Sequence, residues 1–389
     1  MRLALPYGRA PLALPPGLEA DAVLPPASTP IDLAHALDAA LAQPTGSRPL
    51  AEVVTARSQV VVVVGGGPPG EARAEAFAAI RRALAAVPDG RITLAVANGP
   101  HRPGPLERLG LGADVLARHR VVNHDARDAA STVDLGRTSR GTRIRVNRCL
   151  AEADVLVATG RIRPHAVAGY GGGAKSIFPG LAGAEAFAQD PPLDGDPASA
   201  LGHADGNPFR EDLEEAVRRM GRDTFLLNAV EAGGHVLGAV AGDLVYAHRA
   251  GVDLARRACE AEAERADVVV VSAPLPATSR LDRAARLLAP AGLLVREGGA
   301  IVLAAECAEG VGDRRLLMDR LWPLRIRRYF PERCAVLLVS ALPPDEVAET
   351  FARPVPDLAA AIAEARRIAG GDRVLVLPDA RDVVPIPPR

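Results

Sequence analysis

The chain is nearly devoid of lysine: among 389 residues Lys175 is the only one, although lysine and arginine together number 46. Its other scarcities exclude several classes of protein. The four cysteines stand far apart with no CxxC pair, so we expect neither a disulfide framework nor a cysteine-built metal site. The formal net charge is −1, which gives no basis for nucleic acid or an anionic membrane surface as a partner.

Long apolar runs are also missing. No run is long enough to cross a bilayer, and the first residues, MRLALPYGRAPLALPPG, are interrupted by proline and glycine where a signal peptide needs a continuous apolar region. We therefore predict a soluble, cytoplasmic protein. The content of 48% apolar and 24% charged residues is ordinary for a globular chain, and 389 residues suffice for two domains.

What is present is a regular alternation of strands and helices. Continuous β-branched and apolar runs at 60–64, 92–97 and 155–159 predict buried parallel strands. Each is followed by a glycine- or proline-rich loop, and helical patterns follow at 71–87 and 105–119. A second series of strands is predicted at 267–272, 300–304, 334–339 and 374–377. The pattern predicts two α/β domains with mainly parallel sheets, 1–265 and 266–389, and a ligand cleft between them.

Residues 161–183, RIRPHAVAGYGGGAKSIFPGLAG, are the most informative stretch. The run Gly171, Gly172 and Gly173 lets backbone N–H groups converge on an anion such as a phosphate. Lys175 follows two residues later. An amine, unlike a guanidinium, can lose its proton and act as a nucleophile or covalent attachment point. A lysine that only binds phosphate, or that has survived by chance, would give the same sequence.

Two histidines follow predicted strands. His101 lies in NGPHRP (98–103), and His165 begins the stretch just described. Since the carboxyl ends of parallel strands share one sheet edge, we expect both at one site, suited to proton transfer by two bases. Loop hydrogen bonding is the alternative role. His124 of NHD (123–125) is left open, and structural roles are expected for His35, His119, His235 and His248.

The stretch PHAVAGYGGGAKSIFPG (164–180) resembles the nickel-dependent lactate racemase family. In that family this segment carries a catalytic histidine and the lysine that holds a nickel-pincer nucleotide covalently. The resemblance places these roles on His165 and Lys175, with Gly171–Gly173 and Ser176 beside the cofactor. NGPHRP is similar to the loop of the second catalytic histidine, which implies that role for His101. Further similar segments are LPYG (5–8), GNP (206–208), LLNAV (226–230) and AGDL…AH (241–248).

The resemblance implies a racemase or epimerase of a 2-hydroxy acid or related hydroxyl-bearing substrate. The reaction would run by reversible hydride transfer to the cofactor, with the two histidines on opposite sides of the substrate. The implied partners are a small-molecule substrate and cofactor-biosynthesis proteins. The alternative is a family member that has lost the nickel chemistry and binds a nucleotide or another small ligand.

Three departures from the family pattern bear on this choice. The loop GGGPPG (65–70) lacks the arginine that grips the substrate carboxylate. Pro191 falls near the place of the nickel-ligating histidine, and His203 is the first histidine beyond it. Where the family has a glutamine and a lysine, LDRAARLL (281–288) puts Arg283 and Arg286. We expect these two arginines to bind an anionic substrate and His203 to be the candidate metal ligand.

Overall fold

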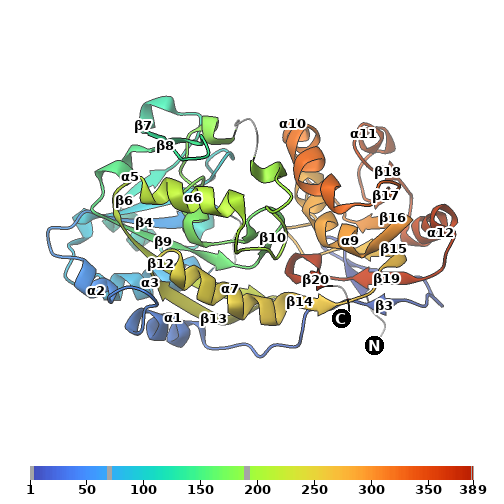
Figure 1. The fold of residues 1–389 in the computed structure, drawn as a ribbon, viewed down its shortest axis with the longest axis horizontal. Helices are drawn as coiled ribbons and strands as arrows, with labels where there is room; N and C mark the ends of the chain where they lie inside the picture. Colours follow the sequence, from blue (N-terminus) through green and yellow to red (C-terminus); the bar gives the residue numbers. More distant parts are fainter. Residues whose placement is uncertain (1–3, 68–71, 188–192, 387, 389) are drawn as a thin grey trace. The chain divides into compact units, whose positions relative to one another are not determined.

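The structure, a computed structural model, describes residues 4–67, 72–187, 193–386 and 388. The chain forms two compact units, which are drawn in Figure 1. The large unit is Ser28–Arg257, and the small unit combines Met1–Ala27 with Ala258–Arg389. The predicted fold class, α/β with mainly parallel sheets, is confirmed. The cleft predicted between the domains stays a prediction.

The division into units corrects the predicted domain boundaries at one point. Residues 1–27 were assigned to the amino-terminal domain, but they belong to the small unit. The reason is a two-residue strand, β3 (Asp21–Ala22), which pairs in parallel with β19 (Val374–Leu377). The N–H of Val23 also donates to the carbonyl oxygen of Val376 at 2.9 Å. A pairing so short and so distant in sequence leaves no periodic signal to predict it.

The large unit is built on one sheet. Within the described residues this sheet has six strands in the order β13-β12-β9-β4-β5-β6. All neighbours run parallel except β13, which is antiparallel to β12. The strands are β4 (Val60–Gly65), β5 (Ile92–Ala97), β6 (Arg120–Asn123), β9 (Val155–Ile162), β12 (Asp223–Ala232) and β13 (His235–Gly242).

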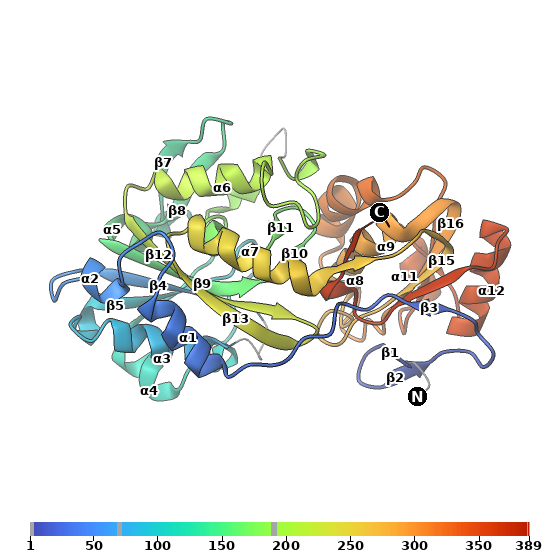
Figure 2. The ribbon, with the colours of Figure 1, turned by 60° about the horizontal axis from the view of Figure 1, so that its bottom comes forward.

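Helices cover both faces of this sheet, as Figure 2 shows. Val60, Val62 and Val64 of β4 pack with the helices of one face, and Val61 and Val63 pack on the other. Burial on two faces explains why β4 is a continuous valine run rather than an alternating one. The helices are α1 (Leu33–Ala42), α2 (Leu50–Val53), α3 (Arg73–Ala83), α4 (Ala113–Arg118), α5 (Arg148–Glu152), α6 (Pro208–Arg218) and α7 (Tyr246–Cys259). Two hairpins complete the unit, β7 (Thr132–Arg137) with β8 (Arg143–Asn147) and β10 (Pro164–His165) with β11 (Gly169–Tyr170).

The small unit has a second parallel sheet, which in its described part follows the order β18-β17-β16-β15-β19-β3. Its remaining strands are β15 (Ala266–Val271), β16 (Val295–Ala304), β17 (Ala335–Val339) and β18 (Arg353–Pro354). Two short pairs lie beside it, β1 (Ala4–Pro6) with β2 (Pro11–Ala13) and β14 (Glu260–Glu262) with β20 (Val384–Ile386). The helices are α8 (Leu281–Ala284), α9 (Leu288–Leu294), α10 (Arg314–Leu316), a π-helix (Leu317–Ile326), α11 (Pro344–Ala348) and α12 (Leu358–Ala369). No helix in the described ranges is both long and apolar enough to span a membrane.

Candidate functional site

Three neighbouring strands end at the same edge of the large sheet. In the sheet order, β9, β4 and β5 are consecutive and mutually parallel. Their exits are therefore the loops that carry His165 with Lys175, the glycines at 65–67, and His101. The edge beyond the carboxyl ends of parallel strands is where ligands bind in open α/β sheets. Pro68, Pro69 and Gly70 of the GGGPPG loop lie outside the described residues.

His165 sits at the start of the β10–β11 hairpin and is half-buried. Its Nδ1 accepts hydrogen bonds from the backbone N–H groups of Val167, at 3.2 Å, and Ala168, at 3.0 Å. These two hydrogen bonds from the β10–β11 hairpin thus fix the orientation of the His165 ring. A nitrogen that accepts two N–H groups carries no proton itself.

Lys175 lies in a short 3₁₀ helix, Gly173–Ser176, and its side chain is half-buried. Gly172 and Gly173 precede it with φ of +71° and +63°, values that glycine adopts without strain. Space is also tight, because a Cβ at Gly173 would come within 2.8 Å of the His248 ring. Glycine is required here both for the backbone turn and for close packing.

The glycine run does not present all its N–H groups to a ligand, which differs from our expectation. The N–H of Gly171 donates to the carbonyl oxygen of Arg163 at 2.8 Å, and that of Gly173 donates to Oδ1 of Asn228 at 2.9 Å. The carbonyl oxygen of Gly171 accepts from Nε2 of His248 at 2.8 Å. The Gly171 and Gly173 amides therefore fix the loop within the protein rather than facing a phosphate.

The first turn of α6 is hydrogen-bonded to the same loop. Asn207 caps the helix, its Oδ1 accepting from the N–H of Arg210, and Pro208 follows at the first helical position. The Nδ2 of Asn207 donates to the carbonyl oxygen of Val167 at 2.8 Å. Arg210 donates from Nε to the carbonyl oxygen of Ala168 at 2.9 Å and from Nη2 to that of Tyr170. Both side chains are fully buried.

The charge of Arg210 is partly compensated inside the protein. Its Nη1 lies 3.9 Å from Oε1 of Glu214, and Nη1 of Arg249 lies 3.3 Å from the same oxygen. Burial lowers the pKa of Arg210 to about 10, which leaves it protonated at neutral pH. Burial also raises the pKa of Glu214. The buried guanidinium of Arg210 is thus in direct contact with the loop that leads to Lys175.

His101 lies on an exposed loop after β5, and this loop is tied to its neighbours. The N–H of Gly99 donates to the carbonyl oxygen of Gly180, in the stretch that carries Lys175, at 2.9 Å. Nη2 of Arg127, from the loop after β6, donates to the carbonyl oxygen of Pro100 at 3.2 Å. The loops of His101 and Lys175 therefore touch each other.

His124, which the sequence left open, has a structural role. It is buried, its Nε2 lies 2.9 Å from the carbonyl oxygen of Ala182, and Nδ2 of Asn147 lies 3.2 Å from its Nδ1. An amide NH₂ only donates, so the ring proton is on Nε2, directed at Ala182. Burial lowers the pKa of His124. Its hydrogen bond to Ala182 holds the carboxyl-terminal end of residues 161–183 in place.

The remaining predicted residues are placed as follows. Ser176 ends the 3₁₀ helix of Lys175, and its Oγ packs against Gly160 of β9. His203 is exposed, with Nδ1 at 3.0 Å from the carbonyl oxygen of Ala198, and Pro191 lies outside the described residues. Among the described residues no cluster of three or more His, Cys, Asp or Glu side chains could hold a metal ion. Arg283 and Arg286 lie in the small unit, on α8 and the turn after it.

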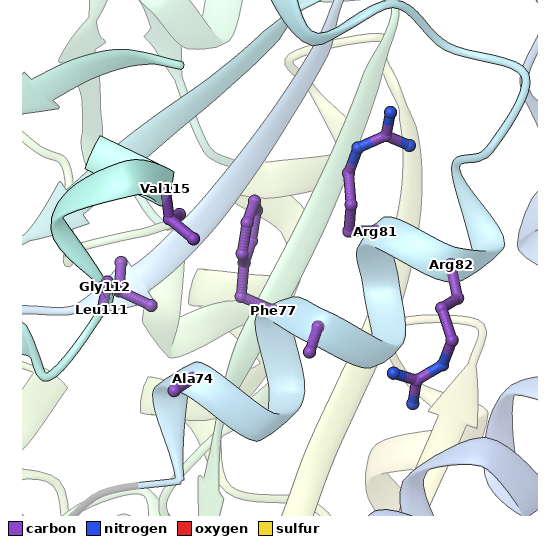
Figure 3. Close-up of a pocket in the computed structure, with 8 residues that line it drawn as sticks. Ala74, Phe77, Arg81, Arg82, Leu111, Gly112 and Val115 are labelled. Atoms are coloured by element: carbon purple, nitrogen blue, oxygen red, sulfur yellow. The ribbon is translucent and has the colours of Figure 1, made fainter. Parts of the chain in front are cut away.

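An apolar groove of about 330 Å³ lies elsewhere in the large unit, between α3 and α4, and is shown in Figure 3. Phe77, Leu111 and Val115 line it. The two arginines at its side are engaged, Arg81 with Asp89 and Arg82 with Asp38. The groove contains none of the predicted site residues.

Comparison with known proteins connects this geometry to a family. Residues 7–190 match the family model described as the lactate racemase N-terminal domain. A lactate racemase from Thermoanaerobacterium thermosaccharolyticum is 26% identical over 325 residues, which cover 75% of this chain and 76% of that protein. One from Lactiplantibacillus plantarum is 29% identical over 239 residues, 60% of this chain and 56% of that protein. Over residues 7–190 the chain is therefore a divergent member of the lactate racemase family.

Solved structures show the same fold along nearly the whole chain. The lactate racemase apoprotein from T. thermosaccharolyticum matches with a TM-score of 0.84 and 24% identity, covering 98% of this chain and 99% of that one. A protein from Thermotoga maritima matches with a TM-score of 0.66 and 16% identity, covering 93% and 100%. The fold is thus the same as that of the lactate racemase apoprotein along nearly the whole chain.

Sequence reasoning missed the residues that support the loop. Asparagine followed by proline is a common helix start, but nothing in GNPFR (206–210) indicates that Asn207 and Arg210 also bind a loop some 40 residues earlier. Arg210 is one arginine among many. The segments similar to the family at 206–208 and 226–230, which contain Asn207 and Asn228, were the only available signal.

Proposed function

We propose that this protein is a racemase or epimerase of a 2-hydroxy acid or a related hydroxyl-bearing substrate, acting by reversible hydride transfer with a nickel-pincer nucleotide. The observation that carries the proposal is the setting of Lys175. The only lysine of the chain lies in the 3₁₀ helix Gly173–Ser176, whose first N–H donates to Asn228. The carbonyl oxygen of Gly171, just before this helix, accepts from His248. A lysine on a fixed backbone is suited to serve as a covalent anchor.

The residues present fit the organic part of such a cofactor better than the metal. Lys175 offers a nucleophile, and the close packing at Gly172 and Gly173 keeps the adjacent backbone free of side chains. When bound, the nucleotide supplies the hydride acceptor that no protein side chain provides. For the metal, His203 stays the candidate ligand, since no three-residue cluster is found within the described ranges.

The chain's own residues would perform the proton chemistry and hold the substrate. His101 follows β5 and His165 follows β9, and these two strands lie on either side of β4 in one parallel sheet. We assign both histidines to the substrate hydroxyl. We assign Arg283 and Arg286 to an anionic group of the substrate. We place the reaction in the cytoplasm, with the cofactor-biosynthesis proteins as partners that load the enzyme.

The test is an intact-mass measurement on protein co-expressed with the cofactor-biosynthesis enzymes in the presence of nickel. We expect a cofactor adduct on the wild type and none on Lys175→Arg, because a guanidinium keeps the charge but forms no such link. The double variant Lys175→Arg/Arg219→Lys is the control, since it restores one lysine at the exposed position that directly follows α6.

Two results would contradict the proposal. An adduct in the double variant would show that attachment does not depend on the place of Lys175. No adduct in the wild type, together with binding of a nucleotide that raises the melting temperature, would favour the alternative, a family member that binds a small ligand without nickel chemistry.

A further inference from the structure

The small unit has its own sheet edge at which parallel strands end beside one another. β15 and β16 are adjacent and parallel, and backbone hydrogen bonds join the loops that follow them. The N–H of Cys307 donates to the carbonyl oxygen of Thr278 at 2.9 Å, and the N–H of Glu309 donates to that of Ser279 at 2.8 Å. Ligands bind at this edge in open α/β sheets, and α8 begins directly after the first of the two loops.

The carboxylate of Asp282, in the first turn of α8, is buried and engaged. Arg280 donates to it from Nε at 3.0 Å and from Nη2 at 2.8 Å, and the N–H of Asp313 donates to its Oδ2 at 3.2 Å. The loop after β16 also packs closely against it, since a Cβ at Gly312 would come within 2.5 Å of this carboxylate. Asp282 is therefore committed to Arg280 and to this loop, rather than to the arginines that follow it.

Arg283 and Arg286 project from the same side of this helical segment. α8 continues directly as the 3₁₀ turn Ala285–Leu287, and residues three apart are neighbours on an α-helix and eclipse each other on a 3₁₀ helix. Nη1 of Arg283 donates to Oγ of Ser279 at 3.2 Å, which holds this guanidinium near the end of β15. Neither Arg283 nor Arg286 forms an ion pair with a carboxylate in the described part of the chain.

A third arginine lies near this pair. The π-helix Leu317–Ile326 packs on the 3₁₀ turn and carries Arg325 in its last turn. Part of the Arg286 side chain is exposed, yet partial desolvation lowers its pKa, the charge of Arg325 lowers it further, and that of Asp282 raises it. π-helical segments are rare and are frequent at functional sites. Like charges gathered around such a segment are typical of a site that attracts an oppositely charged ligand.

Arginines with a structural role look different in the same part of the small unit. They are paired with carboxylates: Arg280 with Asp282, Arg314 with Glu349, and Arg315 with Asp319. Arg283 and Arg286 lie between these pairs in the sequence without such a partner in the described ranges. The missing negative charge is therefore expected from a ligand.

We propose that Arg283, Arg286 and Arg325 together bind two anionic groups, so that the substrate is a 2-hydroxy acid with a second carboxylate or a phosphate. The inference rests on the function proposed above and narrows its substrate class. Residues 65–67 are all glycine and offer no charged group, so both anionic groups are assigned to these arginines. One carboxylate leaves two of the three guanidinium charges unbalanced, and the planar guanidinium suits carboxylate and phosphate equally.

The first experiment measures binding to the full chain without cofactor, by calorimetric titration at pH 7.5 and low salt. The probes are two matched pairs, 2-hydroxysuccinate with 2-hydroxybutyrate and 3-phosphoglycerate with glycerate, and the members of each pair differ in the second anionic group. We expect this group to tighten binding about tenfold or more in at least one pair. The pair that shows the effect identifies the group as carboxylate or phosphate. Equal affinities within both pairs would overturn the proposal.

The second experiment locates the binding site with matched variants. Arg286→Gln removes one charge from the proposed site. Arg315→Gln is the control, because the Arg315 side chain is 94% exposed and pairs with Asp319 on its own helical segment. We expect the advantage of the second anionic group to fall about tenfold in Arg286→Gln, to be kept in part by Arg286→Lys, and to be unchanged in Arg315→Gln. The same affinities in both folded glutamine variants would show that this cluster does not bind the anion.

The third experiment uses the cofactor-loaded enzyme and separates this inference from the proposed function. The ratio kcat/KM for racemisation should be about tenfold or more higher for a probe with the second anionic group than for its matched partner, and Arg286→Gln should remove this preference. Equal kcat/KM values within both pairs would overturn the inference and leave the proposed function intact. Binding as expected, with no racemisation of any probe, would count against the proposed function alone.

Discussion

His248 and Gly171 are 77 positions apart in sequence, yet Nε2 of His248 donates to the carbonyl oxygen of Gly171 at 2.8 Å. The ring is fully buried, and Nη1 of Arg249 lies 3.4 Å from its Nδ1. Burial, assisted by the charge of Arg210, holds the pKa of His248 well below its usual value. Two buried side chains therefore fix the loop that carries Lys175. The neutral ring of His248 donates to the carbonyl oxygen of Gly171, and the amide oxygen of Asn228 accepts from the N–H of Gly173.

This packing predicts a severe effect of Gly173→Ala. Alanine would adopt a φ of +63° and place its Cβ 2.8 Å from the His248 ring. Left-handed strain and overpacking together should lower the free energy of unfolding by about 2–5 kcal/mol. Gly234→Ala is the control, since its φ is +79° but nothing lies within 4 Å, and it should cost only about 1–2 kcal/mol. Urea unfolding of both variants measures the difference, and equal costs would argue against tight packing at Gly173.

Removal of the buried cation should also destabilise the protein. Arg210→Gln leaves the carbonyl of Tyr170 without its donor and Glu214 with less compensation, so we expect a loss of about 3–5 kcal/mol, as for other broken buried pairs. Arg219→Gln, in the exposed pair with Glu215 at 2.7 Å, should cost at most about 1 kcal/mol. Chemical denaturation distinguishes the two sites. An Arg210→Gln protein as stable as Arg219→Gln would show that the first turn of α6 does not depend on this charge.

His124 should make stability depend on pH. Because burial lowers its pKa, the unfolded chain binds the proton more readily than the folded one. The contribution is complete above the unfolded pKa, about 6.5, and is lost as pH falls toward the folded value. As the pH falls below 6.5, the wild type should therefore lose stability more steeply than His124→Gln. Parallel stability curves for the two proteins would contradict this linkage.

Activity on lactate should be weak or absent. Residues 65–67 are all glycine and offer no charged donor to a carboxylate. Loss of a paired, charge-assisted contact costs on the order of 2–5 kcal/mol, a large share of the binding energy of so small a ligand. The measurement is racemisation of D-lactate by the cofactor-loaded protein. Turnover in the usual enzymatic range of about 1–10³ s⁻¹ would show that the arginines assigned above to the anionic group of the substrate, Arg283 and Arg286, are enough to bind the lactate carboxylate.

The parts that sequence reasoning predicted well are those with local, repetitive signals. The valine run of β4 and the apolar segment of β9 predicted buried parallel strands because burial on both faces demands continuous apolar residues. The loops that carry the candidate site residues were predicted from the positions at which these strands end. The roles of His101, His165 and Lys175 rest on the resemblance and stay predictions.

What failed were inferences that depend on distant contacts. The glycine run at 171–173 was interpreted as a phosphate nest, but two of its amides are bound by Arg163 and Asn228. Glycines that permit close packing and glycines that open a ligand site have the same sequence. Likewise, His248 was correctly expected to be structural, but its contact with Gly171 connects α7 to a loop that no periodicity relates to it.

The placement of β3 has a consequence for the order in which the chain is made. Asp21 pairs with Leu375, 354 positions later (375 − 21). At roughly 5–20 residues per second, synthesis needs on the order of 20–70 s to cover that distance. All of Ser28–Arg257 leaves the ribosome in the meantime. In the nascent chain β3 thus stays unpaired while the large unit is synthesised. The sheet of the small unit can gain β3 only after β19 has been made, when translation is almost over.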